Sequence, residues 1–426
     1  MPRRVAHLCR LLLNASMRPE TLAARQTRSL VALVRHAAER VPFYRQLYAA
    51  QGIDIATFNG VGDLAALPIV DKHVLRSAGA DALSADAPAK RVMITTSGSS
   101  GDPFTFPIDR GYDLWRKAQF IRPYLNSGRR LGDKVLRLCA RPSSRPKWFS
   151  RLGVLRERQI DAGTAPARVA EAWQEYAPDV LMGYPSSLRS LAYHCLELSR
   201  PLSPAPRLVF TDSELLTPDT RAVIEQAFGT GPIDVYGTFE TDNIAWQCAA
   251  RADYHIATDC VVLEVVKDGK PVPPGEDGEI VVTVLHNRTF PFIRYNLRDM
   301  GRLGTQPCAC GLPFPMLAGI QGRANDLIVL ADGRRRTATD LTARIGRSDA
   351  LIHQYQLRQL AIGRFELLVV SSSQFGDVER ESLAQIVRSA LGDAHVEVRV
   401  VEAIAPERSG KRRAFISEVR LDADDP

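Results

Sequence analysis

The chain has 426 residues, about three times the ~150 residues that serve as a soft length for one domain, so two or three domains are expected. Hydrophobic residues make up 45% and charged residues 24%, which are ordinary globular values that exclude a disordered or fibrous protein. No apolar run approaches the roughly 20 residues that a membrane-spanning helix needs.

The net charge of +7 lies in residues 1–50, where nine Arg face two Glu. Apolar residues recur there with helical spacing at Leu30, Leu33, Val34 and Ala37, so we expect folded helices with a solvated basic face. A transit peptide and a contact with nucleic acid or a membrane surface stay open as alternatives. Because the charge is confined to this segment, neither nucleic acid nor a membrane is expected as a partner.

Strands and helices alternate along the middle of the chain. The predicted strands are 91–97, 134–139, 179–182, 207–211, 233–236, 261–266 and 279–285, and the predicted helices are 112–125, 165–177, 186–198 and 217–228. This alternation predicts a large α/β domain, with a β-rich subregion from 261 to 303.

A domain boundary is expected at Gly322. Beyond it the sequence predicts strands at 327–330 and 365–370, an amphipathic helix ending near Leu391, and an alternating strand at 396–400. About a hundred residues is a normal size for a separate domain. The predicted domains are therefore 1–322 and 323–426.

A run rich in glycine and hydroxyl groups follows the first predicted strand. Its backbone N–H groups and hydroxyls suit phosphate oxygens, although the spacing and lysine of a P-loop are absent. By itself such a cluster is more often a flexible linker. The candidate residues are Thr95, Thr96, Ser97, Gly98, Ser99, Ser100 and Gly101.

Four later segments also carry chemistry-bearing residues. Tyr236-Gly-Thr-Phe-Glu240 follows a predicted strand, where α/β folds gather ligands. Asp299 also follows a strand and could hold sugar hydroxyls. Gly322-Arg-Ala-Asn-Asp326 opens the small domain, and Ser409-Gly-Lys411 nearly closes it. Each segment alone is more often a turn or a solvated charge.

In this order and spacing, these segments resemble the adenylate-forming superfamily of acyl-CoA synthetases, and within it the phenylacetate–CoA ligase family with its capsule-biosynthesis-like relatives. The stretches 41–45, 67–72, 183–186 and 217–221 also look like that family. The resemblance implies a large multi-sheet adenylation domain and a small mobile α/β domain that rotates between half-reactions.

The activity that the resemblance implies is activation of an aryl or small carboxylic acid with ATP. The carboxylate attacks the α-phosphorus, which gives an acyl-adenylate and pyrophosphate, and a second nucleophile, usually the thiol of coenzyme A, takes the acyl group. An amine or hydroxyl acceptor and a degenerate, non-catalytic nucleotide-binding protein remain alternatives. A cytoplasmic protein is expected, with the choice between monomer and homodimer open.

The resemblance also implies roles for single residues. Thr95 to Gly101 would clasp the triphosphate. The residues implied around the nucleoside are Ser213, Glu214, Tyr236 and Gly237 at the adenine, Asp299 at the ribose hydroxyls, and Arg323 at the ribose or phosphate side. Glu240 would hold Mg²⁺, and Lys411 would bridge the α-phosphate and the acyl carboxylate.

Lysine usage supports Lys411 independently. The 55 basic residues include eight Lys, which leaves 47 Arg, and Lys411 is the only Lys after Lys270. An ammonium is a compact point charge that the planar guanidinium of Arg does not reproduce. A single lysine among arginines therefore predicts a chemical requirement for an ammonium at this position.

Three residues depart from the family pattern. Phe239 stands where a hydroxyl usually contacts the α-phosphate, Asp102 where Lys is common, and Asn325 where the hinge usually has Asp. We expect Thr238 to supply the missing donor. Phe239 then either lines the acyl pocket or lies in the core.

The seven cysteines are an odd number without a secretory context, which favours a reduced compartment. Cys248 with His255, and Cys308 with Cys310, supply the four sulfur and nitrogen ligands of a closed tetrahedral zinc site. The alternative is that these are buried cysteines without a metal. With four protein ligands, such a zinc would be structural.

Overall fold

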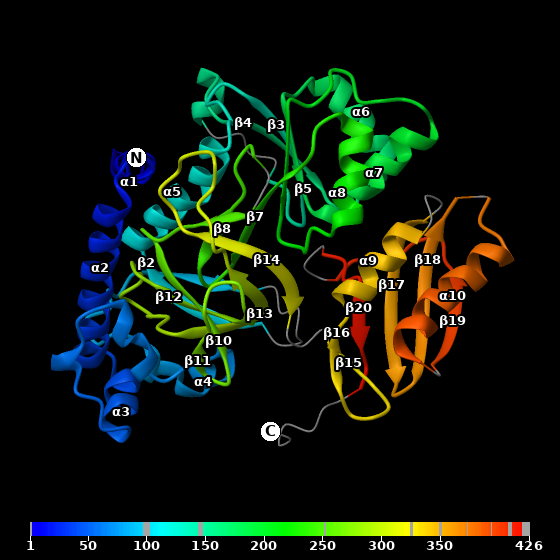
Figure 1. The fold of residues 1–426 in the computed structure, drawn as a ribbon. Helices are drawn as coiled ribbons and strands as arrows, with labels where there is room; N and C mark the ends of the chain where they lie inside the picture. The colour runs from blue at the N-terminus through cyan, green and yellow to red at the C-terminus, as the bar shows by residue number, and fades with distance from the viewer. Residues whose placement is uncertain are drawn as a thin grey trace. The chain divides into compact units, whose positions relative to one another are not determined.

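The computed structural model describes residues 2–96, 103–143, 148–250, 253–323, 327–348, 352–372, 374–392, 394–407 and 411–419. The chain forms two compact units, and each is built from two segments (Figure 1). Unit 1 comprises Met1–Arg129 and Val235–Ile320, and unit 2 comprises Arg130–Asp234 and Gln321–Pro426. The predicted division at Gly322 therefore lies beside the second crossing of the chain into unit 2, and the mobility of a domain 323–426 stays a prediction.

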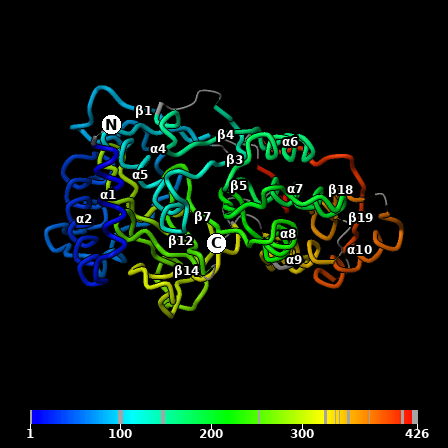
Figure 2. The backbone as a smooth tube through the Cα atoms, turned by 90° about the horizontal axis from the view of Figure 1, so that it is seen from above, coloured from blue at the N-terminus to red at the C-terminus, as the bar shows by residue number. Residues whose placement is uncertain are grey.

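Helices make up the amino-terminal part of unit 1. They are α1 (Pro2–Asn14), α2 (Pro19–Arg40), α3 (Pro42–Ala50), α4 (Lys72–Ala78) and α5 (Arg110–Asn126), with short 3-10 turns at Ile55–Thr57, Val61–Ala66 and Gly79–Ala82. The expected apolar stripe of α2, from Leu30 to Ala37, is buried. Helix α1 packs on α5 (Figures 1 and 2), where a buried ion pair joins Arg122 to Asp259 at 2.6 Å and Asn14 donates to the same carboxylate at 2.7 Å.

The strands of unit 1 confirm the predicted β-rich subregion. A hairpin joins β1 (Arg91–Thr95) to β2 (Thr105–Asp109). The larger sheet has the order β11-β10-β12-β13-β14-β9-β8-β7. Its strands are β7 (Ile233–Thr238), β8 (Asp242–Trp246), β9 (Tyr254–Ile256), β10 (Val261–Lys267), β11 (Lys270–Pro271), β12 (Asp277–Val284), β13 (Tyr295–Leu303) and β14 (Met316–Arg323).

The first segment of unit 2 is a parallel α/β layer in the order β6-β5-β3-β4. Its strands are β3 (Lys134–Cys139), β4 (Arg156–Asp161), β5 (Val180–Gly183) and β6 (Leu208–Asp212), and its helices are α6 (Pro166–Tyr176), α7 (Pro185–Glu197) and α8 (Pro218–Phe228), with a 3-10 turn at Trp148–Leu152. Parallel neighbours need crossover helices, which agrees with the predicted alternation. The helices and strands share a core that includes Trp173, Leu188 and Phe228.

The second segment of unit 2 is a four-stranded sheet in the order β19-β18-β17-β20, with a separate β15–β16 hairpin. The elements are β15 (Leu327–Val329), β16 (Arg335–Thr337), α9 (Thr339–Ser348), β17 (Ile352–Ala361), β18 (Arg364–Ser371), α10 (Asp377–Leu391), β19 (His395–Val400) and β20 (Phe415–Ser417). Helix α10 packs on this sheet through Leu383 and Val387 (Figure 1). The predicted strands at 327–330, 365–370 and 396–400 and the helix ending near Leu391 are present, but the sequence pattern missed β17, whose residues are mostly polar.

Arg189 of α7 ties the two segments of unit 2 together. Its buried guanidinium pairs with Asp219 of α8 and donates to the carbonyls of Gly346 and Ile352, each at 3.4 Å. A Cβ on Gly346 would lie 2.1 Å from the Asp219 carboxylate, so only glycine fits this approach. No helix among the described ranges is long and apolar enough to cross a membrane.

Candidate active site and metal centre

The β7–β8 turn of unit 1, Thr238 to Asp242, carries the candidate residues Thr238 and Glu240. Gly237 precedes it at an irregularity in the strand pairing, and a Cβ there would lie 2.3 Å from the Asp242 carbonyl oxygen. Asp242 adopts the left-handed conformation at φ 61°, which is uncommon for a residue with a side chain. The turn is therefore tight, and Gly237 is required by close backbone approach.

Tyr236 and Asp299 come from two motifs separated by 63 positions and meet in unit 1. The Tyr236 hydroxyl donates to Asp299 Oδ2 at 2.6 Å, and both side chains are partly buried. Asp299 was expected to follow a strand, but β13 continues to Leu303, so Asp299 lies within it. The structure therefore brings a candidate adenine residue next to the candidate ribose residue.

Glu240 contacts the same strand, β13, at a position four residues before Asp299. The Tyr295 hydroxyl donates to Glu240 Oε1 at 3.2 Å. Burial, followed by the neighbouring Glu240 carboxylate, raises the pKa of Tyr295 well above its usual value, so this phenol remains a donor at neutral pH. Tyr295 was not among the residues predicted from the sequence, although it lies only four residues before Asp299.

Thr238 and Phe239 have different surroundings. The Thr238 hydroxyl lies 3.0 Å from the Thr241 hydroxyl and accepts from the Thr241 backbone N–H at 3.3 Å. The Phe239 side chain is 45% exposed. The interpretation of Phe239 as a core residue is therefore wrong, because the tight turn directs this side chain out of the apolar interior.

The Gly- and hydroxyl-rich run begins at the tip of the β1–β2 hairpin. Thr95 Oγ1 lies 3.0 Å from Thr105 Oγ1, and Thr96 Oγ1 accepts from the Phe104 N–H at 2.9 Å. Ser97, Gly98, Ser99, Ser100, Gly101 and Asp102 lie outside the described residues, as do Asn325 and Ser409. The contacts of Thr95 and Thr96 therefore fix only the base of this loop.

The unit 2 candidates form a second group around Glu214. Its carboxylate accepts from the Ser186 N–H at 3.0 Å, the Ser186 hydroxyl at 3.1 Å and the Arg412 N–H at 2.7 Å. Burial raises the pKa of Glu214, while these donors and the neighbouring Lys411 ammonium act in the opposite direction. The Lys411 loop thus meets Glu214 within unit 2.

The two remaining unit 2 candidates are less defined. Ser213 is exposed and has φ 71°, and it precedes Glu214 in the connection after β6. Arg323 is the last residue of β14, and its side chain lies outside the described part of the chain.

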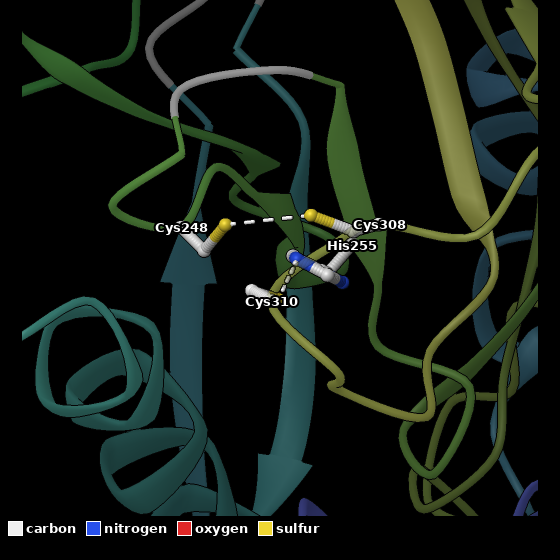
Figure 3. Close-up of side chains that lie close together, drawn as sticks. All are labelled: Cys248, His255, Cys308 and Cys310. Carbon is white, nitrogen blue, oxygen red and sulfur yellow. Dashed lines mark hydrogen bonds between the residues drawn. The ribbon is translucent and has the colours of Figure 1, made fainter.

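Three cysteines and a histidine converge in unit 1 (Figure 3). The ligand atoms of Cys248, His255, Cys308 and Cys310 all lie within 4.8 Å of one another. The Cys248 and Cys308 sulfurs are 3.7 Å apart, and Cys310 Sγ lies 3.3 Å from His255 Nε2. Burial lowers the pKa of His255 to about 4, which keeps its imidazole neutral at neutral pH and able to bind a metal.

The short strand β9 explains the convergence. His255 pairs with Trp246 of β8 on one side and with Met316 of β14 on the other. Cys248 follows β8, and Cys308 and Cys310 precede β14, so both neighbouring strands deliver a sulfur ligand to the central histidine. The set of donors matches the ligands that zinc prefers.

Comparisons with known proteins agree with this fold. The chain is 26% identical over 407 residues to a phenylacetate-coenzyme A ligase of Thermus thermophilus, with 87% of this chain and 86% of that protein covered. It is 22% identical to Protein CapK of Staphylococcus aureus, with 84% and 81% covered. The solved structure of 2-hydroxyisobutyryl-CoA ligase with a bound adenylate superposes with a TM-score of 0.76 at 21% identity, covering 95% of this chain and 91% of that one. No family model matches the sequence.

The chain therefore has the fold of the adenylate-forming acyl-CoA ligases, and its sequence resembles that superfamily, as the motifs indicated. Within that superfamily its sequence is similar to the phenylacetate–CoA ligases and CapK.

Proposed function

We propose that this protein is an AMP-forming ligase that activates a carboxylic acid with ATP and transfers the acyl group to coenzyme A. Two hydrogen bonds in unit 1 support this most directly: the Tyr236 hydroxyl donates to Asp299 at 2.6 Å, and the Tyr295 hydroxyl donates to Glu240 at 3.2 Å. Two motifs with the residue types needed for a nucleotide and its metal thus meet at one sheet. The similarity to phenylacetate-coenzyme A ligases agrees with this activity.

In the first half-reaction, a carboxylate oxygen of the acid attacks the α-phosphorus, and the bond to pyrophosphate breaks. In the second, the thiolate sulfur of coenzyme A attacks the acyl carbonyl carbon, and AMP leaves. Both steps bring anions together, so catalysis depends on positioning and on fixed positive charge and donors. Thr238 is proposed to donate to the α-phosphate, and Asp299 to accept from the ribose hydroxyls.

Lys411 is proposed to bridge the α-phosphate and the acyl carboxylate during adenylation. Its ammonium acts on Glu214 within unit 2, and the next residue, Arg412, donates its N–H to the same carboxylate at 2.7 Å. Glu214 and Ser213 are the proposed adenine residues of unit 2, and Arg323 the proposed ribose or phosphate contact. The Thr95–Gly101 run is the proposed clasp of the triphosphate.

Magnesium is proposed to bind at Glu240. A carboxylate offers two oxygens, and Tyr295 donates to one of them, which orients the group. Mg²⁺ prefers oxygen ligands and binds through one or two carboxylates together with substrate phosphates. When bound, the ion would neutralise phosphate charge.

Zinc is proposed at the cluster of Cys248, His255, Cys308 and Cys310. Three sulfurs and a neutral imidazole nitrogen, all within 4.8 Å, fit a closed tetrahedral site. Because four protein ligands leave no open position, the ion would stabilise the β8–β9–β14 region. The absence of disulfides among the seven described cysteines also supports the proposed cytoplasmic location.

A pyrophosphate-release screen tests the proposed function. The acids are phenylacetate, anthranilate and 2-hydroxyisobutyrate with further aryl and amino acids, each with and without coenzyme A. Acid-dependent release, with thioester formed only when coenzyme A is present, is the expected result. Release that yields amide or ester with an added amine or alcohol, but no thioester, would move the acceptor to the alternative class. Release with none of these acids would refute adenylation of the proposed substrate class, and size-exclusion chromatography distinguishes monomer from homodimer.

A further inference from the structure

Helix α5 contacts the turn that carries Glu240. One guanidinium, that of Arg116, donates through Nη2 to the Phe239 carbonyl at 3.1 Å and through Nε to Asp242 Oδ2 at 3.0 Å. These two acceptors lie on either side of Glu240 in the sequence. A single planar group therefore joins the two ends of the segment in which the proposed magnesium ligand stands.

Gln119, three residues further along α5, continues this contact. Its amide nitrogen donates to the carbonyls of Thr241 at 3.2 Å and Asn243 at 2.9 Å, and Asn243 donates back to the Phe120 carbonyl at 3.1 Å. Residues three apart lie on one face of a helix, so Arg116 and Gln119 contact the turn together. We call Arg116 and Gln119 the α5 clamp.

The clamp acts where water is largely excluded. The Arg116 and Asp242 side chains are only 12% and 11% exposed. In such surroundings a charge-assisted bond is stronger than at the surface, and a bidentate guanidinium also fixes geometry. The turn itself needs this support because Asp242 is in the left-handed conformation. That conformation is energetically unfavourable and persists only where neighbouring groups enforce it.

Glu240 is thus held from two directions. Tyr295 of β13 orients its carboxylate, whereas the α5 clamp fixes the backbone on both sides of it. We propose that Arg116 is a positioning residue for the reaction, which holds the Thr238–Asp242 turn so that Glu240 is presented to Mg²⁺ and the nucleotide. This inference rests on the proposed function.

Three variants test it. Arg116→Met removes both bonds, and Arg116→Lys keeps a charge beside Asp242 but loses the planar fork that reaches two acceptors. Lys117→Met is the matched control, because Lys117 is the next residue of α5, is 51% exposed and pairs with Asp113 of its own helix at 2.5 Å.

Two measurements are made on full-length protein. Hydrogen exchange of the Thr241 and Asn243 amides, in protein without metal or nucleotide, reports the turn directly, since these N–H groups bond to Thr238 Oγ1 and Asp242 Oδ1. We expect exchange about tenfold faster in Arg116→Met, an intermediate rate in Arg116→Lys and the wild-type rate in Lys117→Met. The Mg²⁺ concentration for half-maximal pyrophosphate release should rise about tenfold in Arg116→Met, less in Arg116→Lys and not at all in Lys117→Met. Tenfold is the usual scale for losing a group that orients a metal ligand.

The outcomes separate the inference from the proposed function. Equal effects in Lys117→Met, or a change in only one of the two measurements, would show that Arg116 does not act through the turn on the metal site. If Arg116→Met does not fold, Arg116→Lys decides alone by the same two measurements. A wild-type protein that releases no pyrophosphate with any acid would refute the proposed function and this inference with it, whereas an active wild type with unaffected variants refutes the inference alone.

Discussion

Removal of the proposed zinc is the most quantitative test that the structure allows. Zinc–sulfur bonds of about 2.3 Å and zinc–nitrogen bonds of about 2.05 Å place tetrahedral ligands about 3.8 Å apart for two sulfurs and about 3.6 Å apart for sulfur and nitrogen. The corresponding distances here are 3.7 Å between Cys248 and Cys308 and 3.3 Å between Cys310 and His255. For these two pairs a bound ion would require shifts of only a few tenths of an ångström, and all four ligand atoms lie within 4.8 Å of one another.

A preformed site of this kind binds the folded state selectively. At a free zinc concentration a thousand times its Kd, the stabilisation is about 4 kcal/mol. For a unit of roughly 150–250 residues, each kcal/mol shifts the melting temperature by about 2–4 °C, so loss of zinc should lower it by about 8–16 °C. The destabilisation should appear in unit 1, because all four ligands belong to it.

The assay is elemental analysis and thermal melting of protein purified without added metal. We expect about one zinc per chain, loss of the metal and of thermal stability in Cys308→Ser, and no loss in Cys9→Ser, which changes an exposed free cysteine far from the four ligands in sequence. Zinc content near zero, together with an unchanged melting temperature in chelator, would refute the metal site.

Three further predictions concern single residues. Lys411→Ala should lower acid-dependent pyrophosphate release by about 10²-fold or more, which is the scale for losing a positioned charge. Acyl transfer from a supplied acyl-adenylate should be spared, and equal losses in both steps would contradict the role of Lys411 in adenylation. Thr238→Ala should slow adenylation at least about tenfold, since a hydrogen bond to a charged group is worth about 1.5–3 kcal/mol. Because Phe239 is partly exposed, Phe239→Thr should leave the melting temperature nearly unchanged and alter which acids are accepted. Unchanged kinetics in Thr238→Ala would refute the role of Thr238 as the compensating donor. Burial alone would raise the pKa of Glu366, but hydrogen bonds from Arg399 at 2.6 Å and Arg358 at 2.7 Å bring this pKa below its usual value. Glu366→Gln should therefore lower the melting temperature at pH 7, and the difference from wild type should shrink as the pH falls through the lowered pKa. A difference that is constant from pH 7 to pH 3 would contradict this prediction.

The fold class and the resemblance to the acyl-CoA ligases could be predicted because their signals are local and ordered. The predicted strand 134–139 is β3 itself, and the apolar periodicity of 165–177 and 217–228 matches α6 and α8 within a residue or two. The strand β17 escaped prediction because Gln354, Gln356 and Arg358 interrupt its apolar pattern, and its stability comes from pairing with β18 and β20 instead.

Only those site residues whose side-chain type itself indicates a chemical role could be predicted from the sequence. The four proposed zinc ligands could be predicted from sulfur and imidazole alone, and the structure brings them together. Nothing local marks Arg116 as a partner of a turn more than 120 positions away, because its neighbours read as an ordinary amphipathic helix. The surroundings of Phe239 also depend on the tight turn after Gly237, which the linear sequence does not reveal.

The two-segment construction of unit 1 has a consequence for synthesis on the ribosome. Asn14 and Arg122 both bond to Asp259, which follows Asn14 by 245 positions. At about 5–20 residues per second, roughly 10–50 s pass between the emergence of α1 and that of its partner carboxylate. During this interval Arg122 lacks the counter-charge that its buried position requires, so α1 and α5 cannot reach their final packing. The parallel layer of unit 2, whose strands β3 to β6 are all encoded between these partners, can form its core first. Helices α1 and α5 can therefore reach their final packing only after residue 259 has been synthesised.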